Sequence, residues 1–561
     1  MRGRKTAVYL MTAFLVMVVA ITELYMKKQE EFNLSVYVTS KDNRETINAW
    51  FHDGCYYVFL PSYADPDQAK LVTNVLFPVW IDGERVESAT VCGAFPFNKA
   101  LPITYNAWGE IREEKIYFCQ SGNVPTLYID TASGGMDYIH EDQNHTESGD
   151  LRLYNPEGER DCHAQIQTIN GRGNSTWDRP KKPYSLKLAQ GQDLLGMGSA
   201  KEWILLANFF DSTNMGNKMS YDFAASAGCA YTPECQWVDL YLNGNYAGLY
   251  LISERNEVEP QRINIPKESS FLISRELEIR SIGKNYASFT SDRGIFMRIH
   301  HSGIPEDKTQ AIWQSVENAI YAPGGIDPAT GKYWQDLIDL DSWVQQYLLW
   351  EVFMDWDAAG LSAFFYFDGN TDRVFAGPVW DMDLILSMYY SYPRNAIVAG
   401  RKYIRNPNQE SLFYTMYQKE IFQQRVKELY QQVYRPLLVE LAESGMDAYL
   451  AQSLTAGEIN SIRWEKTHPS EDVHTMKQHL IERIAFLDDY WGAEEKYCYI
   501  DLLDTTVSSS WRRFAVRRGE TADFLPTYSE PWVDYETGES FDPSAPVTGD
   551  RMIRLADSEE E

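Results

Sequence analysis

The stretch GRGNSTWDRPKKPYSLKL, residues 171–188, decides how this sequence is read. Two glycines, an Asn and several hydroxyl side chains stand in a loop before a run that alternates apolar and polar residues. The alternation predicts a strand with Lys187 on its polar side. A glycine loop lets backbone N–H groups approach an anion, which predicts a phosphate site, with a solvated basic loop as the alternative. The basic residues of the stretch are Arg172, Arg179, Lys181, Lys182 and Lys187.

Length and charge narrow the classes of protein to consider. The chain has 561 residues, of which 44% are hydrophobic, and this length is typical of roughly two to four folded domains. Asp and Glu number 80 against 51 Lys and Arg, for a formal net charge of −29. Because such a charge repels a phosphate backbone, it argues against nucleic acid as a partner.

The first 28 residues have the pattern of a targeting segment. Arg2, Arg4 and Lys5 precede an apolar run over residues 7–21, and Lys27 and Lys28 follow it. We expect an uncleaved signal anchor over residues 1–28, with a cleaved secretory signal as the alternative. The rest of the chain is then expected to be membrane-anchored and extracytoplasmic.

The seven cysteines show no CxxC spacing, so the sequence gives no support for a zinc ribbon or a thioredoxin motif. Cys229 and Cys235 flank the short segment AYTPE. They are expected either to close a small disulfide loop or to be buried free thiols.

The pattern along the chain predicts an α+β protein. Short alternating runs separated by Gly, Pro and Asp predict a β-rich domain over residues 29–155. Asn243-Gly244 lies between two apolar runs and predicts a tight hairpin. Later segments have helical spacing and predict amphipathic helices. These segments are DSWVQQYLLWEVFMDWD, SLFYTMYQKEIFQQRVKELYQQVYRPLLVELAESG and TMKQHLIERIAFLDDYWG.

Residues 496–561 again predict strands, with turns at YETG and VTGD. This segment resembles the small β repeats of bacterial surface proteins, present here in one copy, and ends in an acidic tail. We expect a small separate β module.

Four carboxylates form a second constellation, at Asp355, Asp357, Asp381 and Asp383. Each stands at the end of an apolar segment, which implies partial burial, and a buried carboxylate without a partner or metal is costly. Mg²⁺ prefers a few carboxylates together with phosphate oxygens. We expect a hard-cation site, with capping of helices and turns as the alternative for each Asp.

GRGNSTWDRPKKPYSLKL, VDLYLNGNYAGLYLISE, RINIP and GPVWDMD together resemble the spore-coat protein H (CotH) kinase family, over about residues 162–490. The resemblance implies an atypical protein-kinase-like bilobal domain over residues 156–495. It implies transfer of the γ-phosphoryl group of ATP to Ser or Thr of a protein substrate, with Mg²⁺ or alternatively Mn²⁺. A surface or coat protein is the expected partner.

The resemblance also implies roles for single residues. Asp357 falls at the catalytic position, Asp381 is similar to the metal-binding Asp, and Asp383 is expected as a second ligand. Expected contacts to the nucleotide are Lys187, Lys182, Arg172, Gly173 and Asn174.

Two features depart from ordinary kinases. Ser362 stands where the HRDxxxxN pattern has a metal-binding Asn. The predicted helix NMGNKMSYDFAASAG contains no Glu to pair with Lys187, which leaves Glu202 or Glu254 for that role. ATP is scarce outside the cell, so either the orientation of the anchor is reversed, or the nucleotide is supplied in a special compartment, or the domain is a binding module. The alternative function is therefore that of a non-catalytic, kinase-like surface binding or adhesion protein.

Overall fold

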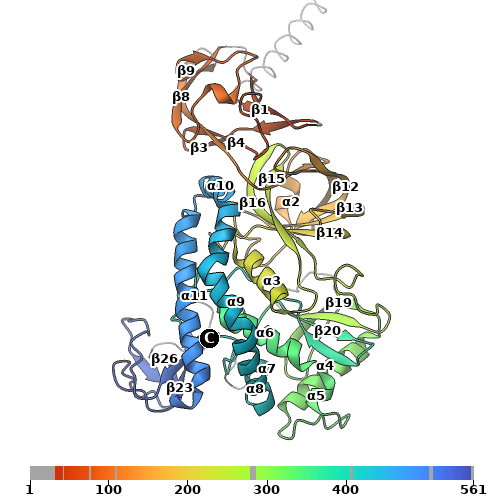
Figure 1. The fold of residues 1–561 in the computed structure, drawn as a ribbon, viewed down its shortest axis with the longest axis vertical. Helices are drawn as coiled ribbons and strands as arrows, with labels where there is room; N and C mark the ends of the chain where they lie inside the picture. Colours follow the sequence, from red (N-terminus) through yellow and green to blue (C-terminus); the bar gives the residue numbers. More distant parts are fainter. Residues whose placement is uncertain are drawn as a thin grey trace, which may run out of the picture.

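The computed structural model describes residues 32–556, except for residues 42, 75–77, 108–109, 278–285, 405–406, 408–409 and 505–509. The expected anchor over residues 1–28 lies outside this part of the chain. None of the helices in the described ranges is long and apolar enough to span a membrane. In Figure 1, an N-terminal β domain, a β-barrel and a larger mixed part follow one another along the long axis. The α+β prediction is confirmed.

A closed seven-stranded barrel forms the centre of the molecule. It closes because β14 pairs with both β13 and β16. Apolar residues alternate along each strand and fill the interior, so Leu186 and Leu188 are buried inside while Lys187 lies on the outer face, as predicted. The strands are β10 (Thr126–Thr131), β11 (Thr146–Tyr154), β12 (Arg160–Gly171), β13 (Tyr184–Asp193), β14 (Ser199–Leu206), β15 (Cys235–Leu242) and β16 (Asn245–Glu254).

The predicted hairpin is confirmed between β15 and β16. Asn243 and Gly244 both have positive φ, at 50° and 79°, which a two-residue hairpin turn requires. Helix α2 (Asp137–Glu141) buries Ile139 among the residues of the barrel interior.

The N-terminal β domain has its own core but shares a sheet with the barrel. Strands β1 (Leu34–Thr39), β2 (Arg44–Asn48) and β5 (Lys70–Thr73) extend the barrel sheet beyond β16. A second sheet has the order β3 (Trp50–His52), β4 (Cys55–Leu60), β9 (Glu110–Gln120), β8 (Ala100–Ala107), β6 (Val79–Ile81) and β7 (Glu84–Arg85), and a short 3₁₀ turn η1 spans Cys92–Ala94. The boundary expected at residue 155 falls between β11 and β12, which are paired strands of the barrel.

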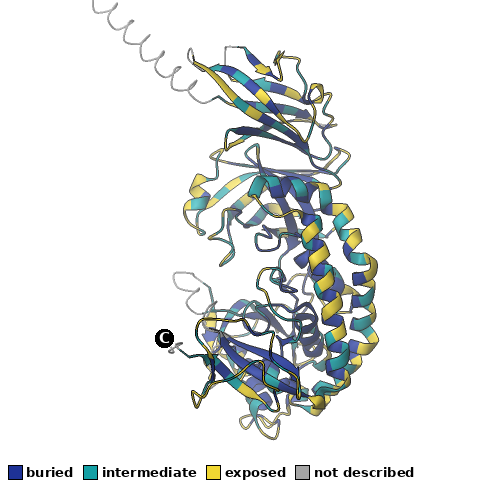
Figure 2. Ribbon diagram, turned by 90° about the vertical axis from the view of Figure 1, so that its left-hand side faces the viewer, coloured by how far each residue is buried: buried dark blue, intermediate teal, exposed yellow. Residues whose placement is uncertain are grey.

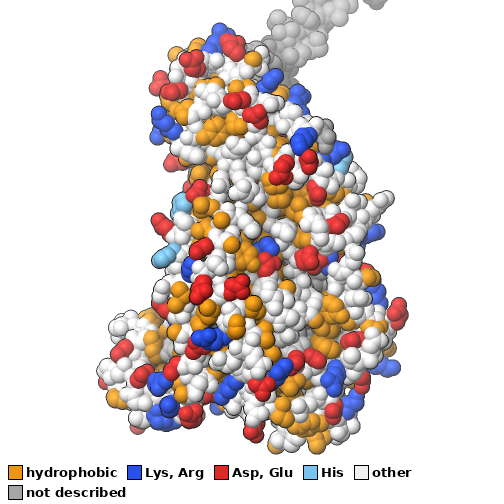
Figure 3. All heavy atoms as spheres, in the orientation of Figure 1, with side chains coloured by type: hydrophobic (Ala, Val, Ile, Leu, Met, Phe, Trp, Pro, Cys, Tyr) orange, Lys and Arg blue, Asp and Glu red, His pale blue; other side chains and the backbone are white. Residues whose placement is uncertain are grey.

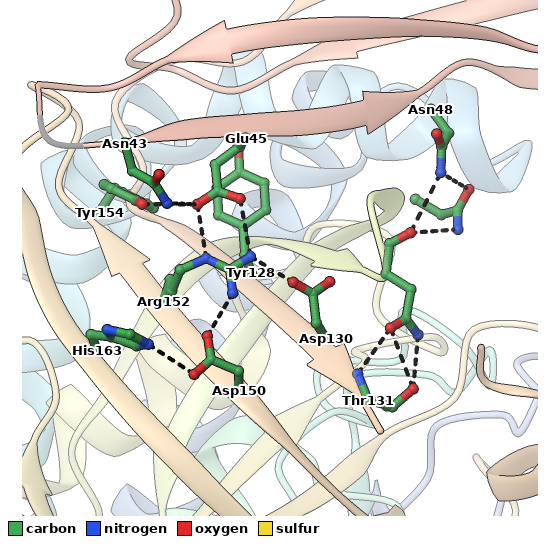
Figure 4. Close-up of polar contacts among 12 residues, drawn as sticks. Asn43, Glu45, Asn48, Tyr128, Asp130, Thr131, Asp150, Arg152, Tyr154 and His163 are labelled. Atoms are coloured by element: carbon green, nitrogen blue, oxygen red, sulfur yellow. Dashed lines mark hydrogen bonds and ion pairs between the residues drawn. The ribbon is translucent and has the colours of Figure 1, made fainter. Parts of the chain in front are cut away.

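A partly buried ionic network joins the N-terminal domain to the barrel (Figure 4). The guanidinium of Arg152 binds both carboxylate oxygens of Glu45, at 2.8 and 3.0 Å. It also binds Asp130 at 2.7 Å and Asp150 at 2.6 Å, and the Tyr154 hydroxyl donates to Glu45. Because Glu45 belongs to β2 and the other residues to β10 and β11, the network fixes one domain on the other.

The larger mixed part is formed by a helix from the segment between β14 and β15 and by the chain after β16. Its sheet has the order β18 (Ser288–Thr290), β19 (Phe296–Ser302), β17 (Phe271–Arg275), β20 (Ala363–Asp368) and β21 (Arg373–Ala376). Its helices are α3 (Gly216–Ser226), α4 (Glu306–Tyr321), α5 (Trp334–Leu337), α6 (Leu340–Phe353), α7 (Leu412–Tyr417), α8 (Glu420–Leu429), α9 (Arg435–Glu440), α10 (Met446–Trp464) and α11 (Pro469–Gly492).

Residues 420–464 are helical throughout, because π-helical turns η3 (Tyr430–Tyr434) and η4 (Leu441–Gly445) join α8, α9 and α10. Helix α10, which the sequence analysis did not predict, packs beside α11, and the two line one side of the molecule (Figure 2). Its end is bound to the barrel, since Trp464 donates to the Ala247 carbonyl at 2.9 Å.

The ion pair between Glu351 of α6 and Arg483 of α11 is fully buried, with Oε1 and Nη2 2.9 Å apart. The Glu351 carboxylate also accepts the backbone N–H groups of Val398, Ala399 and Gly400. Arg483 donates to the carbonyl oxygens of Glu351, Arg394 and Ala396.

The C-terminal residues form a sheet after the 3₁₀ turn η5 (Glu494–Lys496), with the order β22 (Ala396–Ile397), β24 (Ser510–Arg517), β23 (Tyr497–Asp504), β26 (Arg551–Leu555) and β25 (Trp532–Asp534). The predicted strands are present. Ile500 and Phe514 belong to the same apolar core as the helices, so this sheet packs on the larger mixed part.

Each cysteine of the chain is a free thiol, and six of the seven are buried. The disulfide expected as one alternative for Cys229 and Cys235 is not formed, and the free-thiol alternative holds. On the face drawn in Figure 3, acidic and basic side chains are intermixed, so this face is not a field of one sign.

We predict that Arg152→Met lowers the free energy of unfolding in urea by about 3 kcal/mol, because it leaves the Glu45 carboxylate buried without its cation. The control is Arg85→Met. Arg85 pairs with Glu87 at an exposed site, and its loss is expected to change the free energy by less than about 1 kcal/mol. Equal effects of the two variants would contradict a structural role for the network.

Candidate active site

A cavity of about 490 Å³ lies between the barrel and the larger mixed part. The loop after β12 and the outer faces of β13 and β14 line it on one side, and the segments around Asp357 and Asp381 line it on the other. Further lining residues come from the segment between β16 and β19 and from β19 itself. They are Arg255, Asn256, Glu276, Tyr286, Arg298 and His300.

The glycine loop opens onto this cavity with its backbone. A Cβ atom on Gly171 would lie 2.1 Å from the Trp177 ring, and Gly173 has a φ of +86°, so both positions require glycine. Among the described residues, the backbone N–H groups of residues 173–176 have no hydrogen-bond partner. Such a run of N–H groups is suited to an anion.

The two adjacent lysines of the loop hold its shape. Lys181 is buried and donates to the Leu249 carbonyl at 2.6 Å. Lys182 donates to the Trp177 carbonyl at 2.7 Å and lies over the Trp177 ring. Neither lysine is among the lining residues, whereas Arg172, Gly173 and Asn174 all line the cavity.

Lys187 lies on the outer barrel face, where it pairs with Glu202 at 3.2 Å. Glu202 belongs to the neighbouring strand β14 and also pairs with Arg255, which lines the cavity. Of the two partners that the sequence left open, Glu202 is therefore the one in contact, and Glu254 pairs with Arg262. Lys187 itself does not line the cavity, but it shares the partner Glu202 with the lining residue Arg255.

Two arginines of the cavity were missed by the sequence analysis. Arg255 follows β16 directly, and Arg298 is on β19. Within the described part of the chain, Arg298 has no carboxylate partner and its Nε is buried without a hydrogen bond. The alternation of β19 indicates that Arg298 faces away from the apolar side of its strand. It does not indicate which other element Arg298 will face, so no local signal in the sequence identified it as a site residue.

His300 lies beside these arginines. Its Nε2 forms a hydrogen bond with the Ser274 hydroxyl, at 2.9 Å. Burial lowers the pKa of His300 well below its ordinary value, and Arg298 and Arg255 lower it further. The imidazole is therefore neutral at neutral pH, which leaves the arginines as the cations of this side.

The segment of Asp357 begins where α6 ends. Met354 adopts the left-handed conformation, which ends the helix and turns the chain. Asp355, the next residue, is buried. The Asp355 carboxylate accepts the backbone N–H of Asp357 at 3.2 Å. The backbone N–H of Trp356 donates to the Leu384 carbonyl at 3.2 Å, which joins the two acidic segments.

The segment of Asp381 is held from helix α3 and from Ser362. The Ser362 hydroxyl donates to Asp381 Oδ2 at 2.9 Å, so the residue at the unusual position contacts the expected metal ligand. Tyr221 and Asn217 of α3 accept the N–H groups of Asp381 and Met382, at 3.3 and 2.8 Å. Asp381 has a φ of 64°, which is uncommon outside glycine and which these contacts maintain.

Carboxylates concentrate at this side of the cavity. Burial raises the pKa of Asp383 well above its ordinary value, and Asp381, Asp211 and Asp357 raise it further. No group of three or more metal-ligating side chains occurs among the residues that the structure describes. Asp381 and Asp383 both line the cavity. Their carboxylates are the ligand type that a hard cation takes together with phosphate oxygens and water.

These observations define a mixed α+β protein whose cavity joins a glycine loop and arginines to a group of carboxylates. The model of the family described as CotH kinase protein matches residues 169–487, which is more than half of the chain. The chain belongs to this family. No curated protein matches it.

We predict that Asp355→Asn stabilises the protein at neutral pH. Burial raises the pKa of Asp355 well above its ordinary value, and Asp357 and Asp381 add to this. The folded state therefore binds the proton more tightly than the unfolded state, and stability is lost as pH rises through the folded pKa. Asparagine keeps the acceptor oxygen without the charge.

The gain is expected at pH 7, and it should vanish toward about pH 4, where the carboxyl group becomes protonated in the unfolded chain as well. Urea unfolding of both proteins at pH 4 and pH 7 measures it. A variant less stable than the wild type at pH 7 would refute the proposed cost of the buried charge.

Proposed function

We propose that the protein is an atypical protein kinase that transfers the γ-phosphoryl group of ATP to a Ser or Thr hydroxyl of a protein substrate. Family membership supports a kinase-like function. The observation that carries the proposal is that one cavity is lined by Arg172 and the glycine loop opposite Asp357, Asp381 and Asp383. A nucleotide bound to a metal ion complements both groups, because its phosphates are negative and the metal ion is positive.

In this proposal the barrel serves as the N-terminal lobe and the larger mixed part as the C-terminal lobe. Arg172, Arg255 and Arg298 hold the phosphates together with the backbone N–H groups of the glycine loop. Lys187 supports them through Glu202, which it shares with Arg255. The apolar lining of the cavity, from Ile204, Leu206 and Phe364, receives the base.

Asp381 and Asp383 would hold Mg²⁺, or Mn²⁺, which when bound neutralises charge on the phosphates. Ser362 orients Asp381 through its hydroxyl. Asp357 accepts the proton of the acceptor hydroxyl or orients that hydroxyl for attack. The expected acceptor is a surface or coat protein, and the expected setting is a membrane-anchored chain outside the cytoplasm.

We predict that Asp357→Asn and Asp381→Asn each lower phosphoryl transfer by at least about 100-fold, because a general base contributes about 10²–10⁴ and the metal site is required in addition. Transfer from γ-labelled ATP to the chain itself and to a Ser- and Thr-rich protein measures it. Asp372→Asn is the matched control, since Asp372 is exposed and pairs only with Lys332 on the surface.

Normal transfer by either variant would show that the roles are wrongly assigned. If the wild type binds ATP with no transfer in Mg²⁺ or Mn²⁺, the function is that of a non-catalytic binding protein.

We further predict that Arg298→Gln raises the KM for ATP about 10-fold or more, as expected for a charge-assisted contact of about 1.5–3 kcal/mol, with a smaller change in kcat. Arg293→Gln is the control, because Arg293 is exposed, belongs to the same hairpin and is not among the lining residues. An unchanged KM in Arg298→Gln would remove Arg298 from the phosphate contacts.

A further inference from the structure

The indole ring of Trp356 is held by a residue of the C-terminal sheet. The guanidinium of Arg512, on β24, lies 3.3 Å from the centroid of this ring. The rings of Tyr390 and Tyr392 stack with the same indole, at centroid distances of 4.0 and 4.4 Å. Arg512 is buried, and its guanidinium also lies over the Tyr392 ring.

Trp356 stands between Asp355 and Asp357, so a contact that holds its ring also restrains the backbone that carries both carboxylates. The backbone that follows is fixed independently. Arg401 donates to the carbonyl oxygens of Trp356 and Ala358, at 3.4 and 2.7 Å. Arg275 donates to the next carbonyl, that of Ala359, at 2.8 Å. Arg512 thus contacts the Trp356 side chain of this turn, whereas the hydrogen bonds from Arg401 and Arg275 go to its backbone.

The C-terminal sheet is bound firmly enough to serve as a support. Strand β24 pairs with β22, and the side chain of Asn395 donates to the Ala515 carbonyl at 2.9 Å. The backbone N–H of Trp511 donates to the Ile404 carbonyl at 3.0 Å. These contacts run along the segment 395–404, which also supplies Arg401, so the sheet and the turn are held through the same piece of chain.

We propose that Arg512 is a positioning residue for the Asp357 turn, and that the C-terminal sheet is therefore a working part of the active site. This inference rests on the proposed kinase function. Arg512 lies outside the residues that the family model matches, 169–487. A planar guanidinium stacks on an indole in a way that a lysine ammonium does not reproduce.

The test compares Arg512→Ala and Arg512→Lys with the full-length wild type. Arg512→Ala should lower kcat for phosphoryl transfer about 10- to 100-fold, since small misplacements of a reacting group cost about that much. The KM for ATP should stay within about twofold, because the nucleotide contacts are untouched. Arg512→Lys should keep the fold and give a smaller loss. Arg517→Ala is the control, on the same strand but paired at the surface with Asp489.

Hydrogen–deuterium exchange supplies a readout that does not need activity. Amides of residues 354–362 should exchange faster in Arg512→Ala and Arg512→Lys, and those of the barrel should not change. In a double-mutant cycle, Trp356→Leu should add no further loss of kcat to Arg512→Ala. Faster exchange in a protein whose wild type transfers no phosphoryl group would support the positioning role and reject the kinase function. Wild-type exchange and wild-type kcat in Arg512→Lys would overturn the inference, even if Arg512→Ala failed to fold.

Discussion

The buried pair of Glu351 and Arg483 is the constraint on which the active-site side of the molecule depends. Both side chains are fully buried, so their charges must be satisfied by each other and by the backbone. They are satisfied by peptide groups between residues 394 and 400, which brings that segment onto the end of α6. Because α6 leads directly into Asp355 and Asp357, the pair fixes the platform from which those carboxylates project.

The local features of the fold could be predicted from the sequence, while its pairings could not. The turn at Asn243 and Gly244 and the alternation around Lys187 are short-range patterns with a direct physical cause. Barrel closure depends on β14 meeting β16, and alternation shows that a segment is a strand without naming its neighbour. The same limit applies to residues 126–154, whose strands were assigned to the domain before them because nothing local shows that they join the barrel.

The candidate site follows the same division. The glycine loop and the carboxylates are dense local clusters, and they line the cavity together. Arg255 follows β16 and Arg298 is on β19, far apart in the sequence, so only the folded chain shows that they share a site. Lys182 shows the opposite error. Its charge led to the prediction of a contact with an anion, but in the folded chain its ammonium group binds the carbonyl and lies over the ring of Trp177 in the same loop.

The distribution of charge around the cavity has a consequence for how ligands bind under the proposed function. The glycine loop and its N–H groups lie on the barrel side, Arg298 lies on β19 of the larger mixed part, and the carboxylates around Asp383 repel one another. A nucleotide alone would bring its phosphates toward those carboxylates, and a metal ion alone would meet only two of them. Bound together, the metal ion relieves the repulsion among the carboxylates and screens them from the phosphates. Under the proposed function, each ligand therefore lowers the free-energy cost of binding the other.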